Sequence, residues 1–126
     1  MQIIAETHSH TVACDHAYST IYENVCQAAR VGLKFLCVTE HGPAMPGAPG
    51  EMYFGNMPKV VPDFLEGVAI LKGVESNILD YCGRLDLSEK KLAALDWVIA
   101  SYHINCVEPS TPEEHTAGWL DRKSVV

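Results

Sequence analysis

The residues of this chain best suited to chemistry are two histidines one residue apart, His8 and His10, which follow its first apolar run. Ile3 and Ile4 lie in that run and favour a short buried strand over residues 2–6. Because side chains alternate faces along a strand, the two histidines project to the same side, with Cα atoms about 7 Å apart. Two imidazoles on one side of a strand end can bind one metal ion, so the pair predicts a metal site.

Further potential metal ligands follow the later apolar runs. They are His41, Glu75 and His103, and His16 lies in the loop after the first run. In parallel α/β folds the carboxyl ends of the strands meet at one edge, so these side chains are expected to lie together. A single histidine at a strand end is more often a hydrogen-bonded structural residue, but the recurrence favours a shared metal site. Neutral imidazoles and carboxylates suit zinc, iron and manganese, and a glutamate among them is placed to bridge two ions. The sixth histidine, His115, is expected at the surface.

The chain alternates strand-like and helical segments, which is typical of an α/β architecture. Strands are expected over residues 2–6, 35–39, 68–75 and 95–101, and helices over 20–32, over 88–94 and from 111 onward. Thr20 and Glu23 form a capping-box pattern, and Gly32 fits the C-terminal stop of the first helix. The strand over 35–39 is nearly all apolar, as expected for a parallel strand covered on both faces.

The segments between these elements are predicted to be irregular. Residues 42–58 contain four glycines, four prolines and three of the four methionines. That composition predicts a long loop, of the kind that often forms a lid or a binding surface. Residues 77–87 are expected to form a short β excursion around Cys82 and Gly83.

Length and composition limit the class of protein. The 126 residues fit one domain, and the 48% apolar content supports a hydrophobic core. No run of about 18 apolar residues and no basic leader region occurs, so neither a membrane span nor a signal peptide is expected. The formal net charge of -7 argues against broad contact with nucleic acid, although a small phosphorylated substrate stays compatible with it.

The five cysteines are odd in number and scattered, without a CxxC pair. They are Cys14, Cys26, Cys37, Cys82 and Cys106. This pattern indicates reduced thiols that mostly fill the core rather than a disulfide framework, and it favours a cytoplasmic protein.

Five motifs follow one another in an order found in a known family. They are THSHT at residues 7–11, DHAYST at 15–20, TEHGP at 39–43, LKGVESNI at 71–78 and ASYH at 100–103. In this order they resemble the PHP (polymerase and histidinol phosphatase) family, and most closely its small bacterial phosphatase branch, the YcdX type. The resemblance covers about residues 2 to 118 and implies the N-terminal portion of a distorted (β/α)7 barrel with parallel strands.

The resemblance also implies a site at the carboxyl ends of the strands. It holds up to three ions of zinc or manganese, with iron as a further candidate. His8 and His10 would bind one ion, and Glu75 would bridge it to a second ion that His103 also binds.

The third ion would be held by His16 and His41. Glu6 and Glu40 stand where the family commonly has aspartate. We expect these two longer carboxylates to orient histidines.

Two features of the family pattern do not occur in this chain: a histidine on the next strand and a later Asp-x-His pair. Each of the three ions would therefore lack one ligand. A complete parallel barrel takes about 250 residues, so residues 1–120 are expected to form a partial barrel that is truncated after about four strands. Residues 121–126 match nothing in the pattern and are expected to be an atypical tail, from a truncated or chimeric reading frame.

The implied function is that of a metal-dependent phosphatase or phosphoesterase. A hydroxide held between metal ions would hydrolyse a phosphomonoester, and the ions would neutralise the charge that develops on the phosphoryl oxygens. The expected catalytic residues are His8, His10, Glu75 and His103. The expected partner is a small phosphorylated substrate, with no membrane and no nucleic acid.

Two alternatives stay open. Amidohydrolase-like barrels also begin with HxH and hydrolyse other bonds, but they commonly use a lysine bridge, so Glu75 favours the PHP resemblance. The second alternative is a non-catalytic metal-binding fragment. Lys72 and Arg84 are equally plausible as phosphate contacts and as surface residues. Exposed strand edges and an uncovered apolar face predict self-association, so a homo-oligomer is a further expectation.

Overall fold

A computed structural model describes residues 2–121 of the chain. Of the tail expected at 121–126, residues 122–126 lie outside the described residues. The elements in chain order are β1 (Ala5–Glu6), α1 (Ile21–Val31), β2 (Phe35–Val38), α2 (Glu51–Val60), β3 (Phe64–Leu65), β4 (Val68–Asn77), α3 (Glu89–Leu92), β5 (Trp97–Ser101) and α4 (Pro112–Asp121). None of the helices between residues 2 and 121 combines the length and the apolar character needed to cross a membrane.

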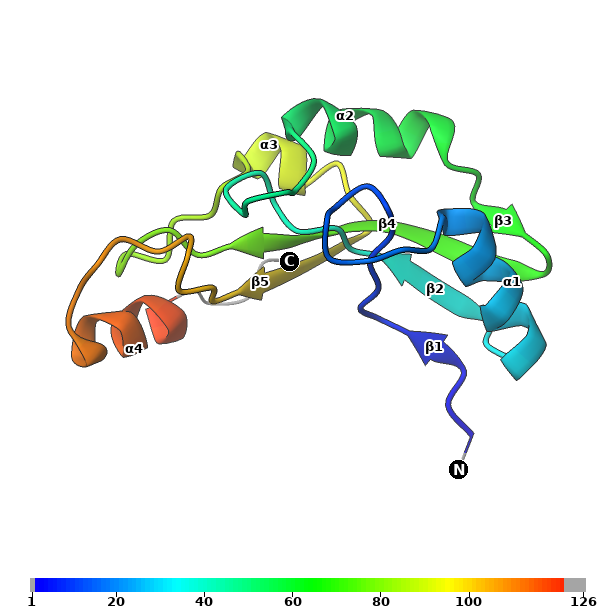
Figure 1. Ribbon diagram of the computed structural model, residues 1–126, viewed down its shortest axis with the longest axis horizontal. Helices are drawn as coiled ribbons and strands as arrows, with labels where there is room; N and C mark the ends of the chain where they lie inside the picture. The colour runs from blue at the N-terminus through cyan, green and yellow to red at the C-terminus, as the bar shows by residue number, and fades with distance from the viewer. Residues whose placement is uncertain (1, 122–126) are drawn as a thin grey trace.

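The strands form one mixed sheet, with parallel and antiparallel pairs, that curls like half of a barrel (Figure 1). β1, β2, β4 and β5 are neighbours in that order, and each of these neighbouring pairs is parallel. β3 is antiparallel to the start of β4. The expected α/β class is therefore confirmed, the curled sheet is consistent with a partial barrel, and the parallel strands bring their carboxyl ends to one edge.

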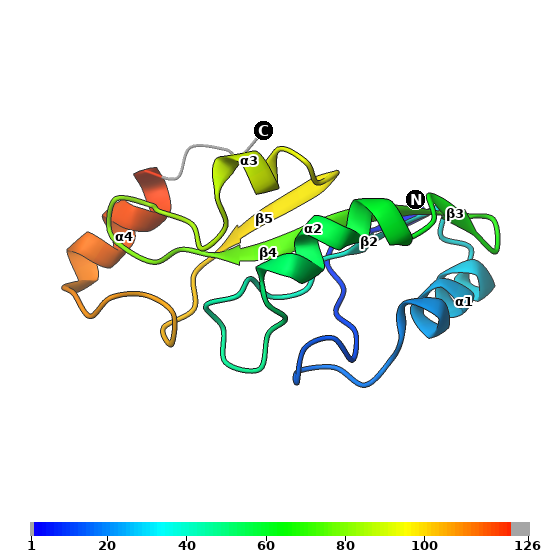
Figure 2. The ribbon, with the colours of Figure 1, turned by 90° about the horizontal axis from the view of Figure 1, so that it is seen from above.

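The hydrophobic core lies between one face of this sheet and the helices. α2 lies over β4, α3 lies next to β5, and α1 lies beside β2 (Figures 1 and 2). Leu36, Ile70 and Val74 from the strands pack with Val25 of α1 and Phe54 of α2. Since side chains alternate along a strand, the odd-numbered residues of β2 and β4 point to the opposite, concave face.

α1 begins and ends where its sequence predicts. The Thr20 side chain accepts a hydrogen bond from the Glu23 backbone, and the Glu23 carboxylate accepts one from the Thr20 backbone, which completes the capping box. Gly32 stops the helix in a left-handed conformation with φ 88°, and its N–H donates to the carbonyls of Ala28 and Ala29.

The long loop predicted over residues 42–58 is partly wrong, because its second half is α2. Gly50 begins this helix and Pro58 lies inside it. Proline inside a helix removes a backbone donor and argues against helix formation in sequence-based reasoning. Tertiary packing overrides that preference here, since Phe54 and Met57 are both buried against the sheet. The irregular loop is confined to residues 42–50.

The first strand is shorter and less buried than predicted. β1 has only two residues, and the preceding Ile3 and Ile4 are 74% and 49% exposed. Its physical setting explains this difference, because β1 pairs with β2 alone among the described residues and leaves its other edge open. The residues that follow, 7–10, belong to no strand.

Later elements also differ in extent. β4 continues past Glu75 to Asn77, because β5 pairs with Gly73–Asn77. β3 was not expected, and it is joined to β4 by Glu66 and Gly67, both with positive φ, a combination that suits a tight hairpin turn.

The β excursion expected over 77–87 is present as a single bridge between Ile78 and Leu85. α4 is a full ten-residue helix, where the sequence predicted only a helix start.

Candidate metal centre

The segment after β1 is fixed to the end of β2 through Ser9, the residue between the two histidines. The Ser9 hydroxyl donates to the Cys37 carbonyl (2.6 Å), and the Ser9 N–H donates to the Thr39 hydroxyl (3.0 Å). The Thr39 N–H donates back to the Ser9 carbonyl (2.8 Å). Because Ser9 is held on one side, His8 and His10 both project to the other, and their Nε2 atoms lie 3.1 Å apart.

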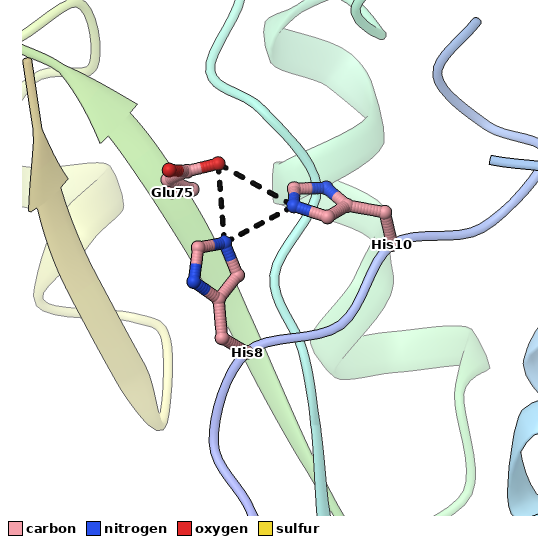
Figure 3. Close-up of side chains that lie close together, drawn as sticks. All are labelled: His8, His10 and Glu75. Atoms are coloured by element: carbon pink, nitrogen blue, oxygen red, sulfur yellow. Dashed lines mark hydrogen bonds and ion pairs between the residues drawn. The ribbon is translucent and has the colours of Figure 1, made fainter. Parts of the chain in front are cut away.

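Glu75 of β4 lies at the middle of the histidine cluster and is buried. Its Oε2 is 3.2 Å from His8 Nε2 and 3.4 Å from His10 Nε2, as Figure 3 shows. The same oxygen is 2.7 Å from His41 Nδ1, and the other oxygen, Oε1, is 3.4 Å from His103 Nε2. One carboxylate therefore faces four imidazoles, three with one oxygen and one with the other.

The parallel sheet explains why residues so far apart in sequence meet here. Val38 of β2 pairs with Lys72 of β4, and three residues later His41 forms an isolated parallel bridge with Glu75. β5 also pairs with β4, and there Ile99 is the register partner of Glu75. The carboxyl ends of β2, β4 and β5 thus converge on the segment that carries His8 and His10.

Two atoms at the centre are left without a suitable partner. His41 Nδ1 and Glu75 Oε2 are buried, and neither makes a hydrogen bond of acceptable geometry within residues 2–121. Buried polar atoms are normally hydrogen-bonded, so an orphaned pair needs an explanation such as a bound ion.

The spacing of the donor atoms fits a metal. His8 Nε2, His10 Nε2 and Glu75 Oε2 form a triangle with sides of 3.1, 3.2 and 3.4 Å. A tetrahedral zinc ion bound at about 2.0–2.1 Å separates its ligand atoms by roughly 3.3 Å. A second group of three close donors, His41, Glu75 and His103, shares Glu75 with the first. The donor set and its spacing therefore fit two ions joined by one carboxylate.

The protonation states favour metal binding. Burial lowers the pKa of His41 to about 4, although the Glu75 carboxylate opposes this shift. Burial also lowers the pKa of His10. For Glu75, burial acts to raise the pKa, but the hydrogen bond from Ser101 and the nearby imidazoles outweigh it, so the net pKa is lowered. Near pH 7 His10 and His41 therefore offer free lone pairs beside the ionised Glu75 carboxylate.

His16 is placed beside this cluster, with its ring centre 4.8 Å from that of His41 and the two rings nearly perpendicular. It belongs to none of the groups of three close donors found in the described part of the chain. A third such group consists of His10, Cys14 and Glu40. The sequence interpretation treated Cys14 as core filler, and only the path of the loop brings it 4.0 Å from His10 Nδ1.

Glu6 and Glu40 hold backbone rather than imidazole rings. Glu6 accepts a hydrogen bond from the His8 N–H (3.0 Å). Glu40 is fully buried and accepts bonds from both the N–H and the hydroxyl of Thr11. Glu40 Oε2 is 3.9 Å from His10 Nδ1, beyond hydrogen-bond distance. The two carboxylates thus fix the chain on either side of the HxH pair.

The two basic residues considered as phosphate contacts are paired elsewhere. The Lys72 ammonium forms an ion pair with Asp63, and its side chain leaves β4 on the face opposite Glu75. Arg84 Nε is 2.9 Å from Asp80. The arrangement gives neither residue a role in the cluster.

Two residues that position the candidate ligands were not predicted from the sequence. Asn77 lies two residues after Glu75, and its Oδ1 is 2.8 Å from His103 Nδ1. Ser9 lies inside the HxH motif itself. Their roles depend on contacts between elements, and the only signal in the sequence is their place next to ligands. His115, expected at the surface, is half-buried and packs its ring against Tyr102.

The chain is an α/β protein whose curled sheet carries a candidate polynuclear metal centre at its carboxyl edge. Known proteins resemble the chain over most of its length. A probable phosphatase of Acetivibrio thermocellus is 52% identical over 116 residues, which are 92% of this chain and 48% of that protein. A probable phosphatase of Caldanaerobacter subterraneus is 54% identical over 114 residues, 90% of this chain and 44% of that protein. One from Aliivibrio fischeri is 50% identical over 121 residues, 96% of this chain and 48% of that protein.

These relatives support a phosphatase family for the chain, which spans about half of their length. No family model matches it. The PHP resemblance therefore stays a prediction.

Proposed function

We propose that this chain carries metal ligands of a metal-dependent phosphatase that hydrolyses a small phosphomonoester. The observation that carries the proposal is the buried carboxylate of Glu75, whose two oxygens face four imidazoles. Its chemical direction comes from relatives that are named as probable phosphatases.

In this proposal His8, His10 and Glu75 hold one zinc or manganese ion, and Glu75 and His103 hold a second. His41 and His16 would hold a third ion. When bound, such ions supply a nucleophilic water at neutral pH and positive charge for the phosphoryl oxygens.

The residues of the chain itself position and balance these ions. Ser9 and Thr39 fix the direction of the two histidines, so the ligand geometry exists before any ion arrives. The ionised Glu75 offsets part of the cationic charge, and the neutral His41 contributes a lone pair without adding charge. This balance leaves net positive charge for an anionic phosphate in a chain whose formal charge is -7.

The proposal is tested by hydrolysis of p-nitrophenyl phosphate. The protein for this assay is a chimera in which residues 1–120 of this chain replace the matching half of the A. thermocellus relative, to which the chain is 52% identical. We expect turnover that a chelator abolishes and added zinc or manganese restores. His115→Gln is the matched control, since it removes an imidazole outside the cluster and should leave turnover unchanged.

Turnover that is indifferent to chelation would contradict the proposal. Metal binding by the chain without phosphatase activity in the chimera would favour the non-catalytic alternative. Chelator-sensitive hydrolysis of amide substrates alone would favour the amidohydrolase-like one.

A further inference from the structure

A hydrogen-bonded relay leads from Asp86, in the excursion between β4 and α3, to His103. The Asp86 carboxylate accepts four hydrogen bonds. Oδ1 accepts from the Ser76 hydroxyl (2.6 Å) and the Asn77 N–H (3.0 Å). Oδ2 accepts from the Asn77 side-chain amide (2.5 Å) and the Ala44 N–H (3.0 Å). The carboxylate therefore ties the end of β4 to the loop that follows His41.

These contacts determine which way the Asn77 amide faces. Its Nδ2 has two partners, Asp86 Oδ2 and the Gly42 carbonyl at 3.0 Å, and both can only accept a hydrogen bond from it. The nitrogen end must therefore face Asp86 and Gly42. The oxygen end, Oδ1, then faces His103 Nδ1 at 2.8 Å, and Asn77 is fully buried, so no solvent offers a substitute partner.

The orientation of the amide fixes the proton on the imidazole. An amide oxygen only accepts hydrogen bonds, so His103 Nδ1 must be the donor. A neutral imidazole carries one proton, and with that proton on Nδ1 the lone pair is left on Nε2. Nε2 is the atom that faces Glu75 Oε1, at 3.4 Å.

We infer that Asp86 and Asn77 are positioning residues that hold His103 in its Nδ1–H tautomer, with the Nε2 lone pair directed at the metal position beside Glu75. The part of this inference that concerns metal rests on the proposed function. The tautomer itself follows from the hydrogen bonds of the chain. Partners of this kind set both the orientation and the basicity of a histidine ligand.

Gly42 shows that the relay needs close approach. A Cβ at this position would lie 2.4 Å from both oxygens of Asp86, far inside contact distance. The absence of a side chain lets the Asp86 carboxylate reach Asn77 and Ala44 together. The Gly42 N–H also donates to the Glu75 carbonyl (2.8 Å), so the same residue joins the relay to the ligand strand.

The test measures the tautomer of His103 directly. Magic-angle-spinning NMR of the chain with ¹⁵N-labelled histidine, in the absence of metal, distinguishes protonated from unprotonated ring nitrogens and does not require a monomer. His103→Gln identifies the His103 signals. We expect a protonated Nδ1 and an unprotonated Nε2 in the wild-type chain near pH 7.5. A neutral His103 with its proton mainly on Nε2 would overturn the inference without any variant.

Variants then test the relay. Asp86→Asn replaces an acceptor with a group that can also donate, so the Asn77 amide loses its fixed direction and His103 should populate the Nε2–H tautomer. Asp80→Asn is the matched control, because Asp80 lies in the same excursion but pairs with Arg84. We expect His103 to show a mixture of both tautomers in Asp86→Asn. In Asp80→Asn it should keep the Nδ1–H tautomer alone. An unchanged His103 tautomer in both Asp86→Asn and Asn77→Leu would overturn the inference.

Zinc titration separates this inference from the proposed function. Loss of a partner behind a histidine ligand typically weakens metal affinity about 10- to 100-fold, and we expect that loss in Asp86→Asn but not in Asp80→Asn. If the wild-type chain binds no zinc while His103 holds its Nδ1 proton, the proposed function fails and the relay stands. Equal zinc affinity in wild type and Asp86→Asn would overturn the role of the relay in metal binding.

Discussion

Glu75 brings a negative charge into the interior of the molecule, and a buried charge is costly unless a partner compensates it. The imidazoles of His10 and His41 do not supply that partner near neutral pH, because burial lowers the pKa of both. A divalent cation would compensate the charge and would also satisfy the orphaned atoms of Glu75 and His41.

Replacing Glu75 by glutamine separates a metal ligand from a structural residue. We expect Glu75→Gln to lower metal affinity by about 100-fold or more, since it affects both ions more directly than an outer partner would. Turnover in the chimera should fall by orders of magnitude. Normal metal content in Glu75→Gln would contradict the assignment.

The cysteines give a prediction about pH. Burial, with the charges of Glu6 and Asp96, raises the pKa of Cys37 from 9.0 to about 11. The folded protein therefore holds this proton more tightly than the unfolded chain. The resulting stability is present below pH 9 and is lost as the pH rises from 9 toward 11. At pH 8 iodoacetamide should modify the exposed Cys82 and spare Cys37. Peptide mass spectrometry measures the modification of each cysteine, and equal modification of both would contradict this prediction.

At the scale of elements, sequence reasoning succeeded where the signal is local. The capping box of α1 depends on Thr20 and Glu23 alone, and the apolar run of β2 on four consecutive residues. It failed where tertiary packing decides. Pro58 disfavours a helix at α2 in the sequence, and no local sequence pattern indicates that Phe54 is buried against the sheet.

The candidate site divides in the same way. The candidate ligands were found from their places at strand ends, because parallel strands bring those ends together. Ser9, Asn77 and Asp86 did not follow, because each acts through a hydrogen bond to another element. Such contacts leave no periodic pattern in the sequence.

The capping box provides a prediction with an internal control. Thr20→Ala removes a side-chain cap and should lower the free energy of unfolding by about 1 kcal/mol. Ser88 occupies the corresponding position of α3, but its side chain makes no capping hydrogen bond. Ser88→Ala should therefore change the free energy of unfolding by only a few tenths of the loss in Thr20→Ala. Urea denaturation of the chimera measures both, and equal losses would contradict the role given to the box.

At the scale of the whole molecule, the concave face of the sheet exposes several large apolar side chains. Phe35 and Trp97 are 42% and 41% exposed, and Phe64 is 68% exposed. The register aligns Phe35 and Phe64 with Ala69 in one row across the sheet. Covering about 300 Å² of such a surface contributes roughly 7 kcal/mol, comparable to the net stability of a domain.

We therefore expect the 126-residue chain by itself to self-associate through this face rather than to remain a well-packed monomer. Phe64→Ser should weaken the association. Tyr18→Ser should not, because Tyr18 is even more exposed, at 94%, but lies in the loop before α1. Sedimentation velocity measures the distribution of species, and a monomer that melts cooperatively and turns over substrate would show that this face needs no cover.

The measurement that tests the central claim most directly is the metal content of the purified chain and of its His8→Gln/His10→Gln double variant. The two imidazoles supply two corners of the donor triangle with Glu75, so the wild-type chain should carry zinc, manganese or iron at up to about one ion per chain, and the double variant should carry almost none. His115→Gln should match the wild type. Equal metal content in the double variant and the wild type, measured by inductively coupled plasma mass spectrometry, would contradict the metal centre described here.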